Sequence, residues 1–139
     1  MAVQYSVAVR NAQLDAKETA IGPGPLLELW SGTKPANCAA ADSAGAKLCT
    51  ITLPSDWLAA ASSGVKSKSG TWSGTGAAAA STGTAATHYR LYDSGRTTCH
   101  EQGSVTVTGG GGELTLDNVS IAENQAVAIS SYSVTAGNA

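Results

Sequence analysis

The chain has 139 residues, which is enough for one domain with a core of its own. Only 13% of the residues are charged, the formal net charge is -2, and the eight Lys and Arg residues are scattered, so the sequence excludes direct binding to nucleic-acid phosphates. Because the chain has no Phe and only 5% aromatic residues, few bulky side chains can fill a core, and we expect an oligomer or a supporting surface to add stability.

The chain contains no apolar run of the roughly eighteen residues that a membrane span needs. Its first residues, Met1–Ser6, have neither the basic segment nor the apolar segment of an export signal. We therefore predict a protein that is made and kept in the cytosol, or assembled there, and that has no membrane partner.

The three cysteines are an odd number and have no Cys-x-x-Cys spacing. In a reducing compartment, Cys38, Cys49 and Cys99 are predicted to be small buried hydrophobic side chains. A bridge between Cys38 and Cys49, across the loop that separates them, is the alternative, and it requires release into an oxidising medium.

Residues 3–21 are predicted to form the one helix of the chain. Ser6 can cap its start, and Gly22 followed by Pro23 ends it. Its apolar stripe is narrow and rich in alanine, so we expect a helix or arm that lies along a neighbouring surface. The positions that carry the pattern are Val7, Leu14 and Ile21 at a spacing of seven, and Ala12, Ala16 and Ala20 at a spacing of four.

Five segments follow before residue 88. Leu26–Trp30 and Lys47–Leu53 are predicted strands with β-branched and leucine side chains. Pro54–Ala61 is predicted to form a short helical turn, because Ser and Asp near its start can accept the free amides. Val65–Trp72 is predicted as an edge strand, since its two lysines discourage pairing with another edge. Ser73–Thr87 contains almost only small residues, so we predict a long exposed loop that is mobile or held by a partner.

The last fifty residues are predicted to be an antiparallel β unit. His88–Tyr92 and a return strand at Thr97–Thr108 form a hairpin around a turn that contains Asp and Gly. The glycine run Gly109–Gly112 is predicted to be a flexible hairpin loop. Glu113–Leu116 and Gln125–Val134 are predicted as further strands, because their side chains alternate between apolar and polar.

The predicted fold class is therefore mainly β. Seven or eight short strands separated by turns indicate an antiparallel β-sandwich or jelly roll. The predicted organisation is an N-terminal helix or arm over residues 1–22 and a β-sandwich domain over residues 23–139.

Two segments resemble chemical motifs, and the spacing argues against both. Cys99-His100-Glu101, with His88 on the paired strand, contains metal-ligand types, but neighbouring residues on a strand point to opposite faces and do not converge on one ion. A nucleophilic cysteine would also need a base and an oxyanion hole, and no pattern supplies them. Gly109–Gly112 lacks the Gly-Lys-Ser/Thr ending and the following helix of a phosphate-binding loop. We predict no enzyme, no metal and no cofactor.

The three tryptophans have two interpretations. Their rings can stack on sugars, but in a chain without Phe they are predicted to be the largest side chains of the core. They are Trp30, Trp57 and Trp72.

Six segments, spread over nearly the whole chain, carry a family resemblance. They are residues 11–22 (NAQLDAKETAIG), 35–43 (PANCAAADS), 53–57 (LPSDW), 89–95 (YRLYDSG), 116–118 (LDN) and 133–138 (SVTAGN). This pattern resembles small virion proteins encoded by tailed bacteriophages and their prophages. The resemblance implies no catalytic residues. The size, the predicted β-sandwich and the low charge are similar to those of head decoration or cement proteins, which sit on the capsid lattice.

The resemblance leads to a first hypothesis, a capsid decoration protein that is assembled in the bacterial host cytoplasm and located on the virion capsid surface. Its partner would be the major capsid protein or another virion protein, and it would act as a dimer or trimer that buries apolar surface at subunit junctions. The predicted contacts are Tyr5, Val9, Leu14, Trp30 and the loop at residues 73–87. A second hypothesis is a receptor-binding or carbohydrate-binding module of the tail or fibre, with Trp72 and Tyr92 in contact.

Overall fold

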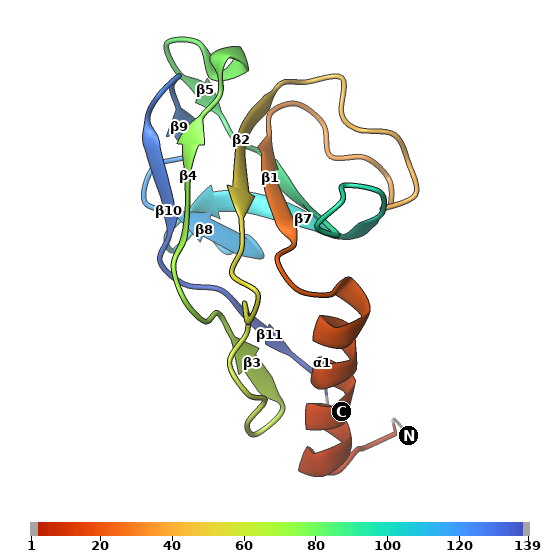
Figure 1. The fold of residues 1–139 in the computed structure, drawn as a ribbon. Coiled ribbons are helices and arrows are strands. Elements are labelled where there is room, and N and C mark those ends of the chain that lie inside the picture. Colours follow the sequence, from red (N-terminus) through yellow and green to blue (C-terminus); the bar gives the residue numbers. More distant parts are fainter. Residues whose placement is uncertain (1–2, 138–139) are drawn as a thin grey trace.

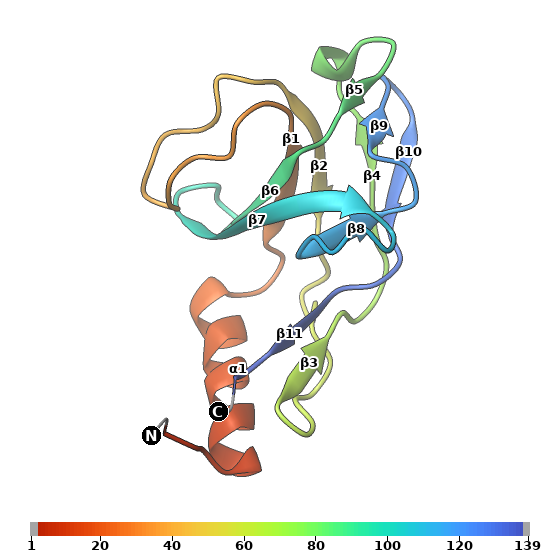
Figure 2. The same cartoon turned by 180° about the vertical axis from the view of Figure 1, so that it is seen from behind.

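The computed structural model describes residues 3–137, which form one helix followed by β-strands and a short 3-10 turn (Figures 1 and 2). The elements in chain order are α1 (Val7–Ile21), β1 (Leu26–Trp30), β2 (Lys47–Thr52), β3 (Val65–Ser67), β4 (Trp72–Gly76), η1 (Ala78–Ala80), β5 (Thr84–Ala85), β6 (His88–Tyr92), β7 (Cys99–Val107), β8 (Leu114–Leu116), β9 (Ser120–Ile121), β10 (Ala126–Ile129) and β11 (Ser133–Thr135).

Seven of the strands form one sheet in the order β10-β4-β2-β1-β6-β7-β8, which is nearly closed into a barrel. All its pairs are antiparallel except β7 with β8. Strand β11 pairs with β3, and β5 with β9, in two small separate sheets. The predicted mainly β fold with one N-terminal helix is confirmed. The single, nearly closed sheet does not clearly match the predicted sandwich or jelly roll.

The inner face of the barrel holds the hydrophobic core. All three tryptophans are buried; Trp57 and Trp72 lie in the core as predicted, whereas Trp30 lies on the outer face of the sheet. Trp72 lies between Trp57 and Tyr132, with ring centroids at 6.1 and 5.2 Å. The indole N–H of Trp57 donates to the Gly22 carbonyl at 3.2 Å, so this buried polar atom is satisfied.

Helix α1 begins later than predicted, at Val7, and ends at Ile21 as predicted. The side chain of Ser6 accepts a hydrogen bond from the amide of Val9 at 3.3 Å, which confirms the predicted N-cap. Gly22 adopts a positive φ of 86° at the C-terminal end, a conformation that favours glycine.

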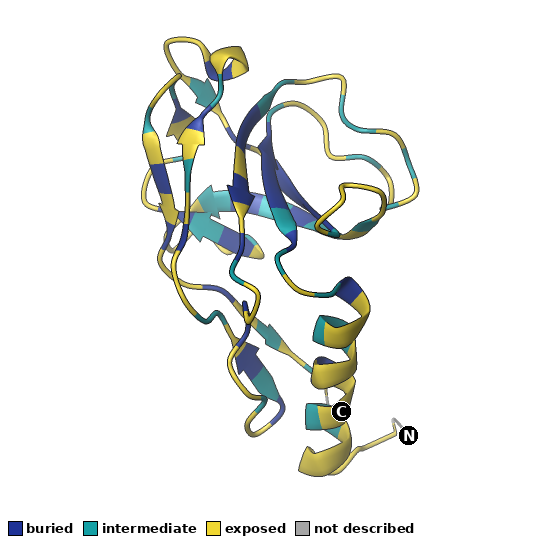
Figure 3. Cartoon of the chain, viewed as in Figure 1, coloured by how far each residue is buried: buried dark blue, intermediate teal, exposed yellow. Residues whose placement is uncertain are grey.

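The helix lies beside β3 and β11, below the barrel (Figures 1 and 2). Arg10 of the helix donates to the Ala136 carbonyl, just after β11. Only Leu14 and Ile21 of α1 are buried, and most of the helix surface is exposed (Figure 3). This arrangement agrees with a narrow apolar stripe.

The predicted helical turn at residues 54–61 is wrong. Trp57 and Leu58 are consecutive and both buried, which requires an extended backbone with both sides covered. The segment instead pairs along the chain that follows β3, where the amide of Ser69 donates to the Trp57 carbonyl at 2.8 Å and Leu58 bridges to Lys68.

The predicted edge strand at residues 65–72 is two strands, β3 and β4, that belong to different sheets. Lys66 does not protect an exposed edge, because its side chain is buried against α1. The predicted strand at residues 125–134 is likewise divided into β10 and β11, since the chain leaves the barrel after Ile129 to pair with β3.

The predicted exposed loop at residues 73–87 is also wrong, because the segment is folded as β4, η1 and β5. Backbone hydrogen bonds order it instead of large apolar side chains. The amide of Gly76 donates to Gln125 and that of Ala77 to Leu48, at 2.8 and 2.7 Å. A Cβ at Gly76 would lie 1.9 Å from the carbonyl oxygen of Ala122, so the close approach of the two chains requires glycine here.

The glycine run 109–112 is not the loop of an antiparallel hairpin, because β7 and β8 are parallel. Parallel neighbours normally need a long crossover. Here the chain doubles back along β7: the amide of Gly110 donates to Val107, and that of Gly112 donates to the hydroxyl of Thr106. A Cβ at Gly110 would lie 2.8 Å from the Thr106 side chain, which explains why small residues occupy this return.

Candidate functional site

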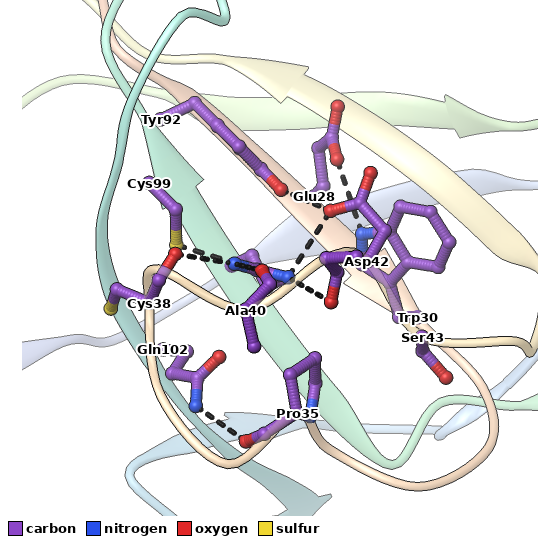
Figure 4. Close-up of polar contacts among 12 residues, drawn as sticks. Glu28, Trp30, Pro35, Cys38, Ala40, Asp42, Ser43, Tyr92, Cys99 and Gln102 are labelled. Carbon is purple, nitrogen blue, oxygen red and sulfur yellow. Dashed lines mark hydrogen bonds and ion pairs between the residues drawn. The ribbon is translucent and has the colours of Figure 1, made fainter.

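The loop at residues 31–46 covers the outer face of β1, β6 and β7. Alternate residues of these strands point outward, while their neighbours face the core. We name the resulting set of polar side chains the loop cluster, of which Figure 4 labels Glu28, Asp42 and Tyr92. It consists of Glu28 from β1, Arg90 and Tyr92 from β6, Arg96 from the following turn, and Asp42 from the loop.

Arg90 is the centre of the loop cluster and is 1% exposed. Its guanidinium holds the backbone of the loop, which has no regular secondary structure. It donates to the carbonyl oxygens of Cys38 (2.8 Å), Ala40 (3.0 Å) and Ala41 (3.1 Å), and to the sulfur of Cys99 (3.3 Å). The planar guanidinium presents several fixed donors, and here they orient the loop.

The second charge centre is Glu28, which is 0% exposed. Arg96 binds it through Nε and Nη2 at 2.6 and 3.0 Å, and the indole N–H of Trp30 donates to it at 3.1 Å. Lys47 adds a longer ion pair at 3.4 Å. Burial of a carboxylate is costly unless such partners bind it.

Asp42 joins the two arginines. It lies 3.2 Å from Arg90 and 2.8 Å from Arg96, and it accepts a hydrogen bond from Tyr92. Burial alone would raise the pKa of Asp42, but hydrogen bonds from Tyr92 and Arg96 and the charges of both arginines hold that pKa below its usual value. The charges of the loop cluster are directed at one another, so the cluster anchors the loop.

His88, on the same outer face, is fully buried. Its Nδ1 lies 3.0 Å from the hydroxyl of Thr87, and its Nε2 has no hydrogen-bond partner among the described residues. Burial, with the charges of Arg90 and Lys34, lowers the pKa of His88. The imidazole is therefore neutral near pH 7 and adds no charge beside Arg90.

A second set of ion pairs, which we name the helix dock, holds α1 against the strands below the barrel. Lys66 is 4% exposed and lies 2.7 Å from Asp15 and 2.9 Å from Glu18. Arg10 donates to the Ala136 carbonyl at 2.9 Å, next to the helix start. Polar contacts therefore join α1 to the segments around β3 and β11, in addition to the buried side chains of Leu14 and Ile21.

Glu101 also contacts the helix, through Lys17. Its neighbours show how the residues of the Cys99-His100-Glu101 segment are placed. It accepts hydrogen bonds from Tyr89 at 2.5 Å and Tyr132 at 2.6 Å, and it pairs with Lys17. His100 is exposed, while Glu101 is half-buried beside a cleft of about 450 Å³ next to α1. Over residues 3–137, no group of three or more His, Cys, Asp and Glu side chains is placed to hold a metal ion.

The third feature is a run of exposed apolar side chains near the start of the chain. We name this segment the N-terminal face, and its exposed apolar side chains are Val3 (69% exposed), Tyr5, Val7 and Val9. Within the described part of the chain, the other large exposed hydrophobic side chain is Val107, at the end of β7. The start of α1 lies at the opposite end of the molecule from β5 (Figure 1).

The predicted contact residues fall into two groups. Tyr5 and Val9 lie on the N-terminal face and are exposed. Leu14 lies on the buried side of α1, Trp30 lies beneath the loop at residues 31–46, and Trp72 lies in the core. These three side chains are therefore covered by the chain itself.

Sequence reasoning missed Val3, and it placed Val7 on the apolar stripe with Leu14 and Ile21, whereas Val7 is exposed. A signal was present, because apolar residues occupy every second position from Val3 to Val9. Val7 and Val9 are two positions apart on a helix that repeats every 3.6 residues, so one side of the helix cannot bury both.

Among the described residues, no helix is both long and apolar enough to cross a bilayer. Comparison of the chain with protein-family models, with curated proteins and with solved structures finds no match, so function has to be inferred from the residues of this chain.

Proposed function

We propose that the chain is a structural protein of a tailed-bacteriophage particle, a decoration or cement protein that attaches to the major capsid protein and stabilises the head. The resemblance of the sequence segments to phage virion proteins motivates this proposal. The low charge, 13% of residues, also suits a protein that packs against other protein.

The observation that carries the proposal is the N-terminal face. Four of the five large exposed apolar side chains in the described part of the chain lie within residues 3–9. Several large exposed apolar side chains within one short segment are unusual and favour an interaction surface, whereas single ones need no explanation. Burying them against a partner would contribute about 25 cal/mol per Å² before the costs of association.

The rest of the molecule suits this mode of attachment. Helix α1 carries two of the four apolar side chains and is joined to the strands by the ion pairs of Lys66. The barrel would remain outside the contact. A dimer or trimer would present several such faces at once, and linked sites bind more tightly than one alone.

The contacts proposed are therefore Tyr5 and Val9, together with Val3 and Val7. Leu14 and Trp30 are no longer part of the contact, because both are buried within the chain.

The test uses phage particles produced without this chain, to which purified protein is added back. The variant carries Val7→Ser and Val9→Ser, since Ser and Val have similar helix propensities. The matched control is Val107→Ser, which removes a side chain of similar exposure on the barrel. We expect the double variant to be lost from sedimented particles, and the control to remain bound like the parent.

Heating the same particles gives the second readout. Particles with bound parent protein or control variant should release DNA at a higher temperature than particles with none. Equal release temperatures, or absence of the parent protein from sedimented particles, would reject the proposed function. Equal binding of the double variant and the control would reject the N-terminal face as the contact.

A tail or fibre module that binds sugars or a receptor is not favoured by any observation. Trp72 and Tyr92, the side chains expected to make that contact, are buried. The number of copies per particle separates the two positions, because a capsid protein approaches the copy number of the major capsid protein and a tail protein does not.

A further inference from the structure

Cys38 and Cys99 come together from distant parts of the sequence. Cys38 lies in a turn of the loop at residues 31–46, and Cys99 is the first residue of β7. Arg90 contacts both, through Nη2 to the Cys38 carbonyl at 2.8 Å and through Nε to the Cys99 sulfur at 3.3 Å. Arg90 therefore joins the two residues, and the Cys99 thiol is close enough to act on the Cys38 thiol. Both residues lie at the same end of the loop cluster (Figure 4).

The third cysteine is elsewhere. Cys49 lies on β2 with its side chain in the core, and it is fully buried. Burial raises the pKa of the Cys49 thiol to about 11, which further reduces its reactivity. All three cysteines are free, and the predicted burial is confirmed for Cys49 but not for Cys38 and Cys99, which are half-buried. The alternative bridge, Cys38 with Cys49, would have to reach a thiol in the core.

We propose that Cys38 and Cys99 form an intramolecular disulfide when the protein meets a small-molecule disulfide, such as glutathione disulfide, in an oxidising medium. One protein thiolate attacks glutathione disulfide, forms a mixed disulfide and releases one glutathione. The second protein thiolate attacks the mixed disulfide and releases the other glutathione. The protein loses two protons and two electrons, and the two glutathione sulfurs gain them.

The surroundings of both cysteines permit the small movement that an S–S bond requires. Cys38 lies in irregular backbone without strand pairing. Cys99 lies where the register between β6 and β7 shifts, opposite Tyr92. Both side chains are half-buried, so a small disulfide can reach them without unfolding of the core.

The bond would convert the attachment of the loop from polar contacts into a covalent link. In the reduced protein, Arg90 holds the loop through carbonyl oxygens. In the oxidised protein, the loop would also be joined to β7. The consequence is greater resistance to unfolding, because a cross-link between distant residues restricts the unfolded chain. This inference does not depend on the proposed attachment to a capsid.

Burial and the neighbouring Cys99 thiol raise the pKa of Cys38, although the charge of Arg90 opposes this shift. The thiolate is the reacting form, so the rate of bond formation should increase with pH.

The experiment incubates the folded parent protein with glutathione disulfide, blocks remaining thiols with a maleimide, and maps peptides by mass spectrometry without reductant. We expect a linked peptide pair that contains Cys38 and Cys99, maleimide on Cys49 after unfolding, and a higher urea midpoint that reverts with reductant. Cys49→Ser should form the same link, and Cys38→Ser and Cys99→Ser should not.

The disulfide is mapped in the folded parent protein, so the test gives a result even if a variant folds poorly. A link that contains Cys49, a link between two chains, or glutathione retained on Cys38 and Cys99 without a link would overturn the inference. Oxidation of urea-unfolded protein is the reference. Unfolding removes the preference for the Cys38–Cys99 pair and should therefore give mixed pairings of the three cysteines.

Discussion

The loop at residues 31–46 and helix α1 are both fastened to the β-strands through ion pairs, but the two attachments differ in burial. In the loop cluster, Glu28 and Arg90 are both inaccessible to solvent. In the helix dock, Lys66 is buried, but its partner Asp15 has a side chain that is 58% exposed. The loop is therefore held around two buried charges, Glu28 and Arg90, with partly exposed partners, and the helix around one buried charge, Lys66.

The difference in burial predicts different costs when one member of each set of ion pairs is removed. Removal of one member of a buried set leaves the others charged without water, which is costly. Removal of one member of an exposed set leaves partners that water can solvate, which costs little. We infer that the loop is part of the stable domain, whereas α1 can be loosened without unfolding the barrel. The end of α1 that carries the N-terminal face is thus the more adaptable part of the molecule.

The largest effect is expected for Arg90→Met. The substitution removes the donors to three loop carbonyls and leaves Asp42 with fewer partners. We expect a loss of about 3–5 kcal/mol in the free energy of unfolding, since one partner of a buried network is removed. Urea unfolding followed by intrinsic fluorescence measures this loss.

Lys34→Met is the control for Arg90→Met. Lys34 is exposed in the same loop, and loss of its charge should change the free energy of unfolding by less than about 0.5 kcal/mol. If Arg90→Met were as stable as Lys34→Met, the loop cluster would not anchor the loop.

A smaller effect is expected for Lys66→Met. The substitution removes the partner of Asp15 and Glu18, but both carboxylates retain access to water. We expect a loss of about 1 kcal/mol in the free energy of unfolding. Proteolysis of α1 should become faster, while the barrel remains resistant.

A double-mutant cycle isolates the ion pair. Lys66→Met, Glu18→Gln and the double variant should show a coupling of about 0.5–1 kcal/mol. A coupling as large as the loss from Arg90→Met would remove the contrast between the helix dock and the loop cluster.

Much of the barrel could be predicted, because its central strands follow simple patterns. Strands β1, β2, β6 and β7 were found from apolar and β-branched side chains. Strands β4 and β5 were missed, since the sequence from residue 73 to 87 contains few large side chains and is ordered through backbone hydrogen bonds to distant segments. Local composition carries no information about such partners.

The sequence contains a signal for the loop cluster that the sequence analysis did not use. Glu28 and Arg90 are each the central residue of a short apolar strand, at positions where a charge is unexpected without a buried partner. The identity of the partners could not be predicted, because Arg90 binds backbone carbonyls about fifty positions away, and any residue type supplies a carbonyl. The pairing of Cys38 with Cys99 follows from the same contact.

The two attachments should respond to opposite ends of the pH scale. The folded-state pKa of Asp42 is below its usual value of about 3.9, so its contribution is present above that pH and is lost as pH falls through the folded pKa. Burial would lower the pKa of Lys66, but Asp15 and Glu18 raise it above its usual value of about 10.4. Its contribution is present below that pH and is lost as pH rises through the folded pKa.

Measurement of the urea midpoint against pH tests this pair of expectations. Asp42→Asn should flatten the acid side of the profile, and Lys66→Met should flatten the alkaline side. Each change is expected to be smaller than the effect of the corresponding loss of Arg90 or Lys66 at neutral pH. If Asp42→Asn changed the alkaline side of the profile, or Lys66→Met the acid side, the assignment of Asp42 to acid stability and Lys66 to alkaline stability would be wrong.

The smallest effect is expected for Ser6→Ala, at the start of α1. Ser6 accepts a hydrogen bond from the amide of Val9, and loss of an N-cap costs about 0.5–1 kcal/mol of helix stability. Because the first turn lies outside the core, we expect almost no change in the urea midpoint of the barrel but faster hydrogen exchange of the first helical amides. Ser6→Asp should restore slow exchange, since Asp caps helices as well as Ser does. If Ser6→Ala instead lowered the midpoint as much as Arg90→Met, the helix start would be part of the same cooperative unit as the loop. The N-terminal face would then be a fixed part of the folded domain, and the inference that it is adaptable would be wrong.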